Sequence, residues 1–278
     1  MRIYSILLTS ASLAVALLAA PAMAQSANED RPFQGLYVGG SFGFDAQPND
    51  VGESITFDRN LDGRFGDAIT TTGGANAFST GFCNGQARSA SRADGCVNDR
   101  DSYSYSGRIG YDRQYGPIVI GVVGEFGTSR IRDSVSGFTT TPASYTINRE
   151  INYTANARIR AGYALNKSLF YATGGGVYAR VNNYFRSTNV VNGFRSNADS
   201  NAYGYTVGGG IEQKLGRHFS IGVEYLFNRL QDADYRVRVS AGPPTSPFTL
   251  GNASGTDFAR SFEKFRWHSV RAVALFRF

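Results

Sequence analysis

Oxygen-bearing side chains recur at alternate positions in the segment FDRNLDGRFGD, residues 57–67. Alternating oxygen ligands followed by a glycine, here Gly63, are typical of a calcium-binding loop. Ile69 stands where such loops usually have a bidentate Glu, so another carboxylate would have to complete the site. The candidate ligands are Asp58, Asn60, Asp62 and Asp67. The pattern predicts either a calcium site or an Asx-rich turn in a solvated loop.

The only two cysteines, Cys83 and Cys96, lie in the same long segment of the chain. In an oxidising compartment two such thiols are expected to pair. Closing a loop of this size is worth about 3 kcal/mol in the chain-entropy model. A zinc site would need further ligands, and the two histidines, His218 and His268, lie far away in sequence. We therefore predict a Cys83–Cys96 disulfide.

Charged side chains alternate with apolar ones in several longer segments. In residues 150–165, Arg158 and Arg160 share one side of an extended strand, and Ile159 lies on the other. The charged residues on such faces are Arg108, Asp112, Glu125, Arg158, Arg160, Glu212, Glu224 and Arg271. An element with one apolar and one charged face must separate two environments.

Eight segments with this two-residue period could position those side chains. They are residues 34–46, 102–114, 117–131, 150–165, 168–186, 201–215, 218–237 and 262–278. Most are longer than the usual strand of about five or six residues, and a membrane strand needs about 9–11. The 33 Gly, 16 Tyr and 20 Phe of the chain also favour β-structure.

The N-terminus indicates export. Arg2, a short apolar stretch and the small residues Ala22 and Ala24 predict a signal peptide over residues 1–24. From residue 25 onward no stretch has the roughly 20 apolar residues of a membrane-spanning helix, so a membrane location would require strands. The formal charge of +6 does not indicate nucleic acid, because the protein is exported and its arginines are spread singly.

Short and long connections alternate strictly between the eight segments. The long ones are residues 47–101, 132–149, 187–200 and 238–261. Short periplasmic turns and long outer loops are typical of outer-membrane barrels. We therefore predict an all-β fold for residues 25–278, an eight-stranded antiparallel up-and-down transmembrane β-barrel with long extracellular loops. Its expected location is the outer membrane of a Gram-negative bacterium.

Several of these segments resemble a known family. GLYVGGSFGF, GRIGY, GVEYLF and the terminal VALFRF are similar to the small outer-membrane β-barrels of alphaproteobacteria, which are called porin-like or OmpA-like. The resemblance covers nearly all predicted strands and little of the loops. It implies that the barrel-assembly machinery reads the last strand through Phe276 and Phe278. It also implies an abundant surface or structural protein, although some members form pores or bind haem or host molecules.

The inward charges allow two interpretations. An eight-stranded barrel has an interior that side chains fill, so the charges must pair as a structural ionic core, or else line a narrow gated pore. His218 and Ser220 share a face, as in barrels that deacylate lipid, but they follow a turn at the periplasmic end, whereas that chemistry takes place at the outer leaflet. We therefore predict that the protein is not an enzyme.

The predicted role is to add to envelope integrity and to present loops at the surface. A small porin for ions or small solutes is one alternative. A loop-based receptor or adhesin for haem, calcium or a host surface is another. The expected partners are outer-membrane lipid, lipopolysaccharide and the barrel-assembly machinery, with no nucleic acid and with any extracellular ligand left open. No cofactor is expected except calcium.

Overall fold

The computed structural model describes residues 31–48, 52–197 and 199–278. The predicted signal peptide lies outside the described residues. Among those residues, no helix is long and apolar enough to cross a membrane.

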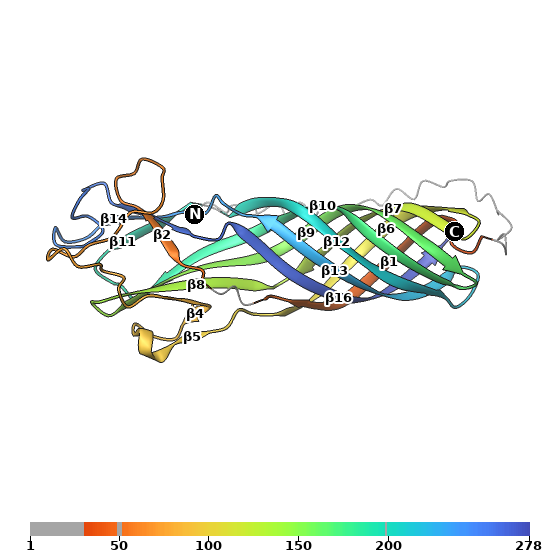
Figure 1. The fold of residues 1–278 in the computed structure, drawn as a ribbon, viewed down its shortest axis with the longest axis horizontal. Helices are drawn as coiled ribbons and strands as arrows, with labels where there is room; N and C mark the ends of the chain where they lie inside the picture. Colours follow the sequence, from red (N-terminus) through yellow and green to blue (C-terminus); the bar gives the residue numbers. More distant parts are fainter. Residues whose placement is uncertain (1–30, 49–51, 198) are drawn as a thin grey trace, which may run out of the picture.

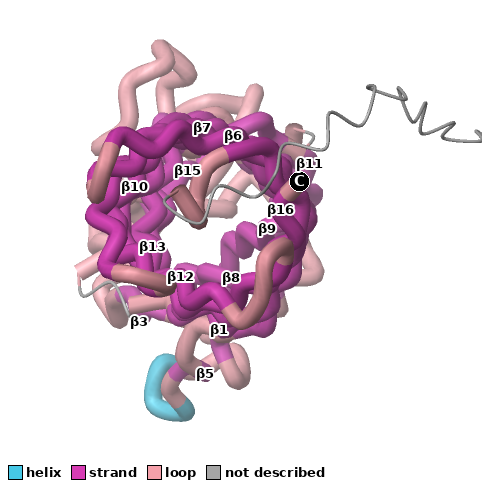
Figure 2. The backbone as a smooth tube through the Cα atoms, turned by 90° about the vertical axis from the view of Figure 1, so that its right-hand side faces the viewer, coloured by secondary structure: helices cyan, strands magenta, loops and turns pink. Residues whose placement is uncertain are grey.

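Eight antiparallel strands close into a barrel, as the alternating pattern predicts (Figures 1 and 2). They are β1 (Gly35–Ala46), β6 (Ser102–Tyr115), β7 (Ile118–Ser129), β9 (Ala143–Leu165), β10 (Ser168–Ser187), β12 (Ser200–Lys214), β13 (Phe219–Gln231) and β16 (Lys264–Arg277). Each strand pairs with the next one of this set, and the first and last strands, β1 and β16, pair over ten positions from Tyr37–Arg277 to Ala46–His268. The predicted fold class is confirmed.

Tight turns join the strands at the end where the described chain begins and ends. Gly116 and Asn166 adopt left-handed backbone conformations, with φ of 58° and 52°, in the turns between β6 and β7 and between β9 and β10. Positive φ at a two-residue turn matches the right-handed twist of the strands that it joins. These turns leave the opposite end of the barrel to the long connections (Figure 1).

The outward side chains of the barrel are mainly apolar and exposed. Val122, Ile159 and Val223 each have more than half of their surface exposed. Aromatic side chains gather towards both ends of the strands, with Tyr103, Tyr105 and Phe126 at one end and Tyr115 and Phe278 at the other. This is the surface of a barrel in a lipid bilayer, an apolar band between two aromatic girdles.

The long connections, predicted to be loops, contain ordered strands. β8 (Arg132–Thr139) pairs with the outer part of β9, and β3 (Phe82–Asn84) pairs with β8. A second sheet has the order β11 (Gly193–Ser196), β14 (Val237–Ala241), β15 (Thr256–Arg260) and β2 (Ile55–Asp58). β4 (Gln86–Ala87), β5 (Cys96–Val97) and the short 3₁₀ helix η1 (Arg92–Asp94) complete the first connection.

These outer strands enclose a hydrophobic core of their own. Phe78, Tyr145, Phe248 and Phe258 are buried there, with ring centroids of Tyr145 and Phe248 5.4 Å apart. We call this outer region, from the second sheet to β8 and the outer part of β9, the extracellular cap. Two strand ends therefore differ from prediction: β9 begins at Ala143 because its outer half pairs with β8, and β13 ends at Gln231 because residues 237–241 join the second sheet.

Candidate functional site in the barrel interior

The middle of the barrel interior is filled by five charged side chains. Glu125 from β7 contacts three arginines, with 2.6 Å to Arg108, 3.0 Å to Arg158 and 2.5 Å to Arg271. Glu224 from β13 contacts Arg108 at 3.0 Å and Arg158 at 3.2 Å. All five side chains are at least 92 % buried. Because each arginine reaches a carboxylate on another strand, the group binds opposite walls of the barrel together.

A second ionic layer lies nearer the short turns. Arg160 contacts Asp112 and, at 3.0 Å, Glu212. Arg277 contacts Asp112 at 2.9 Å and Glu212 at 3.2 Å. Both guanidinium groups lie over the ring of Tyr37, each 4.8 Å from its centroid. This layer is a closed ring of two cations and two anions stacked on an aromatic face.

Glycines on the inner wall make room for these side chains. A Cβ on Gly121 would lie 2.0 Å from an oxygen of Asp112, and one on Gly110 would lie 2.3 Å from the ring of Tyr37. Glycine is thus required at these positions of the strands because large charged and aromatic side chains occupy the space next to them in the interior.

The chain segment before β1 closes the inner end. Phe33 is fully buried among Val119, Leu169 and Tyr171. Its N–H donates to Oε1 of Gln114 at 3.0 Å, and its carbonyl accepts from Arg277 at 2.7 Å. Phe33 is therefore held inside the barrel by both apolar contacts and hydrogen bonds.

Apolar side chains close the interior at the end nearer the cap, on the opposite side of the ionic layers from Phe33. Trp267, Phe265 and Leu230 are at least 98 % buried in a cluster with Ile131 and Ile151. A cavity of only about 10 Å³ lies between this cluster and the central ionic layer, lined by Asp45, Ser129, Glu125, Asn156, Trp267 and Arg271 among others. Such a volume holds about one water molecule.

A third group of charges joins the first connection to the cap. Arg260 from β15 contacts Glu53 at 2.5 Å and Asp133 at 2.7 Å, and Asp133 contacts Arg149 at 2.5 Å. Burial raises the pKa of Glu53 despite its contact with Arg260. Burial also acts to raise the pKa of Asp133, but Arg149 and Arg260 outweigh it and hold that pKa below its usual value.

Asp99 lies beside this group, and within the described part of the chain no arginine forms an ion pair with it. Its carboxylate accepts the backbone N–H of Ser134 at 2.8 Å. Burial, and then the nearby Asp133 carboxylate, raise the pKa of Asp99 to about 7. The end of the first connection is therefore attached to β8 through a carboxyl group that titrates near neutral pH.

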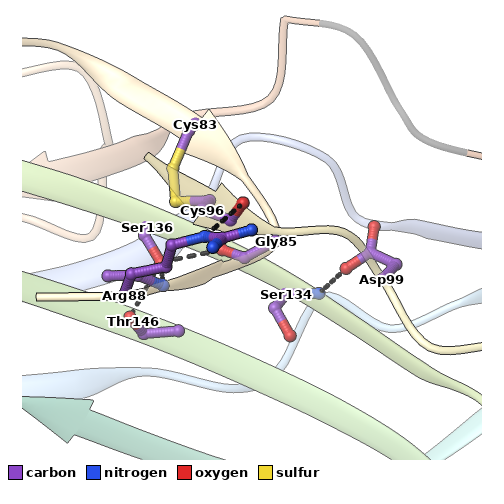
Figure 3. The surroundings of a disulfide bond; sticks show 9 residues. Cys83, Gly85, Arg88, Cys96, Asp99, Ser134, Ser136 and Thr146 are labelled. Atoms are coloured by element: carbon purple, nitrogen blue, oxygen red, sulfur yellow. Dashed lines mark hydrogen bonds between the residues drawn. A yellow bond between two sulfur atoms is a disulfide. The ribbon is translucent and has the colours of Figure 1, made fainter. Parts of the chain in front are cut away.

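The cysteines form the predicted Cys83–Cys96 disulfide, with Cα atoms 6.4 Å apart (Figure 3). It connects β3 to β5, and the adjacent segment is fixed to β8, where Ser136 donates to the carbonyl of Gly85 at 2.8 Å. The disulfide therefore closes the outer hairpin of the first connection against the wall of the cap.

The candidate calcium ligands lie close together but are bonded to the backbone of their own loop. Asp58 accepts the N–H groups of Asp62 and Gly63, at 3.2 and 2.8 Å. Asp67 accepts the N–H of Arg59 at 2.8 Å, and Asn60 donates to Asp62. Among the described residues, no three His, Cys, Asp or Glu side chains form a group that could hold a metal. The arrangement is an Asx-rich turn, and calcium binding stays a prediction.

The remaining residues discussed in the sequence analysis, His218, Ser220, Phe276 and Phe278, do not form a common site. Ser220 donates to Glu212 at 2.7 Å, whereas Nδ1 of His218 contacts the carbonyl of Arg277 at 2.8 Å. Phe276 and Phe278 lie on the outer face, 47 % and 67 % exposed, and the Phe278 N–H donates to the carbonyl of Leu36 at 2.9 Å. The terminal residue is thus part of the β1–β16 seam.

Several residues of the interior were not among those predicted from the sequence. Arg277 continues the inward alternation of Arg271, so the period alone could have identified it. Phe33 precedes the strand pattern, and Glu53 and Asp133 come from the long connections, where no period marks an inward face. A pocket of about 250 Å³ in the cap, lined by Phe65, Tyr235, Arg236, Arg260 and Glu263 among others, also had no sequence signal.

No known family model matches the chain. It is 30 % identical over 140 residues to a 22 kDa outer membrane protein of Rhizobium leguminosarum bv. viciae, a match that covers 50 % of this chain and 58 % of the relative. The match thus spans less than two thirds of that relative's length.

Two solved structures are distantly similar. One is Ail, the attachment invasion locus protein of Yersinia pestis, with 10 % identity, a TM-score of 0.33 and coverage of 88 % of this chain and 99 % of Ail. The other is the outer membrane protease OmpT of Escherichia coli, with 10 % identity, a TM-score of 0.41 and coverage of 88 % and 97 %. The fold assignment itself comes from the strand pairing and the lipid-facing surface. The chain is an outer-membrane β-barrel protein, as the resemblance of its strands implies.

Proposed function

We propose that this protein is a non-enzymatic, poorly conducting outer-membrane barrel that adds to envelope integrity and carries an ordered cap at the cell surface. The observation that supports a closed barrel is the filling of its interior at successive levels. Phe33, the two ionic layers, and the apolar cluster around Trp267 follow one another along the axis. A solute would have to displace several of these groups to pass.

The structure of the cap is consistent with a role in presenting ordered segments at the cell surface. Its core aromatic residues and its charge group around Arg260 hold the first connection against β8 and β15. The cap pocket, at about 250 Å³, is smaller than the roughly 300–1,000 Å³ of common ligand sites. The second candidate is a receptor, and the size of this pocket would limit its ligand to a small molecule.

Conductance of the purified mature protein in planar bilayers tests the proposal. We expect rare, small current steps, because buried side chains occupy the interior at successive levels along the axis. A variant with Glu125→Ala and Glu224→Ala, which removes both central carboxylates, should conduct more often. A large and steady conductance of the unaltered protein would contradict the proposal and favour the porin.

A further inference from the structure

The cap pocket lies where the second sheet meets the connection that follows β13. β2 contributes Thr56 to its wall, β15 contributes Ala259, and the connection between β13 and β14 contributes Tyr235 and Arg236. Phe65, from the first connection, adds a second aromatic ring. The wall is therefore partly apolar and partly charged, and its volume of about 250 Å³ is below that of a typical site for a drug-sized ligand.

An arginine and a glutamate in this wall have no ionic partner. The guanidinium of Arg236 lies over the Phe65 ring, 4.9 Å from its centroid, and forms no ion pair within the described part of the chain. Glu263 accepts only a long hydrogen bond, at 3.5 Å, from Gln231. Arg260, the other arginine of the wall, is instead occupied by two carboxylates of the cap. Two opposite charges thus line one pocket without pairing with each other.

Backbone hydrogen bonds hold both of these residues in place. The N–H of Arg236 donates to Oδ1 of Asn197 at 2.8 Å, and its carbonyl accepts the N–H of Asn197 at 3.2 Å. The carbonyl of Glu263 accepts the N–H of Asp232 at 2.7 Å, which brings a second carboxylate residue of the pocket next to Glu263. The pocket therefore presents one guanidinium and, separately from it, two neighbouring carboxylate residues on a backbone that is already ordered.

We propose that the cap pocket binds a small zwitterion, a free amino acid with an apolar side chain. Its carboxylate would accept paired hydrogen bonds from Arg236, and its ammonium group would donate to Glu263 and Asp232. The side chain of the ligand would pack on Phe65 and Ala259. A ligand with a single charge would satisfy only one of the two unpaired groups. The inference rests on the receptor candidate for the cap and is independent of whether the barrel conducts.

Saturation-transfer NMR titrations of the refolded mature protein in detergent micelles test the site with four probes. L-Phenylalanine carries both charges, phenethylamine lacks the carboxylate, and 3-phenylpropionate lacks the ammonium group. Glucose is an uncharged molecule with many hydroxyl groups. We expect L-phenylalanine to bind about tenfold more tightly than either single-charge analogue, because each analogue loses one set of charged hydrogen bonds. Glucose should not bind.

Two variants assign the charges to their residues. Arg236→Gln should weaken binding of L-phenylalanine about tenfold and leave phenethylamine unchanged, because that probe has no carboxylate. Glu263→Gln should weaken L-phenylalanine and leave 3-phenylpropionate unchanged. Arg195→Gln is the matched control, since Arg195 is an exposed arginine of the cap on β11 and does not line the pocket. Heat-modifiable gel migration would verify that every variant folds.

The possible failures of this experiment have different meanings. Equal binding of L-phenylalanine and a single-charge analogue, or an equal loss in Arg195→Gln, would overturn the zwitterion site. Binding of glucose alone would also overturn it but would keep the receptor candidate. If none of the four probes binds at millimolar concentration, both the zwitterion site and the receptor candidate are contradicted, and the conductance test of the closed barrel is unaffected.

Discussion

Glu125 is the residue on which the central ionic layer depends most, because three arginines from three other strands converge on its two oxygens. Desolvating so many charges is costly, and they are stable together only while the set is complete. The stability of this layer therefore depends on the arrangement of all five side chains and not on any single arginine.

We expect Glu125→Gln to destabilise the barrel by about 3–5 kcal/mol, the usual loss when one partner of a buried ion pair is removed. Three arginines would then share the single carboxylate of Glu224. Urea unfolding in detergent micelles, followed by tryptophan fluorescence from the buried Trp267, measures the change. Glu263→Gln, at an exposed carboxylate, is the control and should change little. Equal stability of the two variants would show that the layer contributes little to folding.

Asp99 should make attachment of the first connection depend on pH. Its pKa is about 7 in the folded protein and lower in the unfolded chain, so the folded state holds the proton more tightly. Stability from this group is greatest at acidic pH and is lost as the pH rises towards and through 7. The raised pKa of Glu53 acts in the same direction, whereas the lowered pKa of Asp133 acts in the opposite one.

Limited proteolysis of the first connection would therefore be slower at pH 5.5 than at pH 8. The difference should shrink in Asp99→Asn, which cannot ionise, and should persist in Asp94→Asn, a change at an exposed carboxylate in the same connection. A protease with similar activity at both pH values is required. The same pH dependence in both variants would exclude Asp99 as its source.

At the scale of the element, β16 decides whether the barrel closes. It pairs with β13 on one side and with β1 on the other, and Phe278, which directly follows it, donates its N–H to the carbonyl of Leu36 at the start of β1. An open edge in hydrocarbon would leave backbone groups unsatisfied, so the strand has no stable unpaired state in the membrane.

We expect deletion of Phe278 to leave unfolded protein in the periplasm, because the final strand loses its terminal aromatic residue and a bond of the seam. Phe278→Tyr keeps the aromatic ring and should assemble normally. Outer-membrane yield and heat-modifiable gel migration measure assembly. Normal values for the deletion would show that recognition of the strand does not require its last residue.

The elements differed in how far their sequence could predict them. The eight barrel strands were predicted because apolar and polar residues alternate over a dozen or more positions, and the inward side of the charged residues followed from the same period. The ion-pair partners of these residues could not be predicted from the period, because they lie far apart in sequence. Arg160 and Asp112, for example, are 48 residues apart. The cap was missed because its strands are short and distant, such as β2 and β15, which pair Ile55 with Arg260.

At the scale of the whole molecule, the lengths of the strands separate an embedded part from an external one. β9 has 23 residues and β10 has 20, which correspond to about 65–75 Å along the strand. A tilt of about 35–45° and an apolar band of about 25 Å leave roughly half of this length outside the membrane. The barrel wall therefore continues into the cap as one structure, and the cap inherits the rigidity of the barrel (Figure 1).

Arg277 has a consequence for the order of events during assembly. It lies next to the last residue of the chain, yet it donates to the carbonyl of Phe33, which precedes the first strand. Phe33 therefore cannot take up its full set of bonds before the final strand is in place. The contacts of Phe33 with β6, β7 and β10 can form earlier, but its bond to Arg277 forms only when the wall closes, so closure of the wall completes the seal of the interior. A circular permutant with its termini moved to the turn at Asn166 would carry both residues on one continuous segment, and its plug could form early.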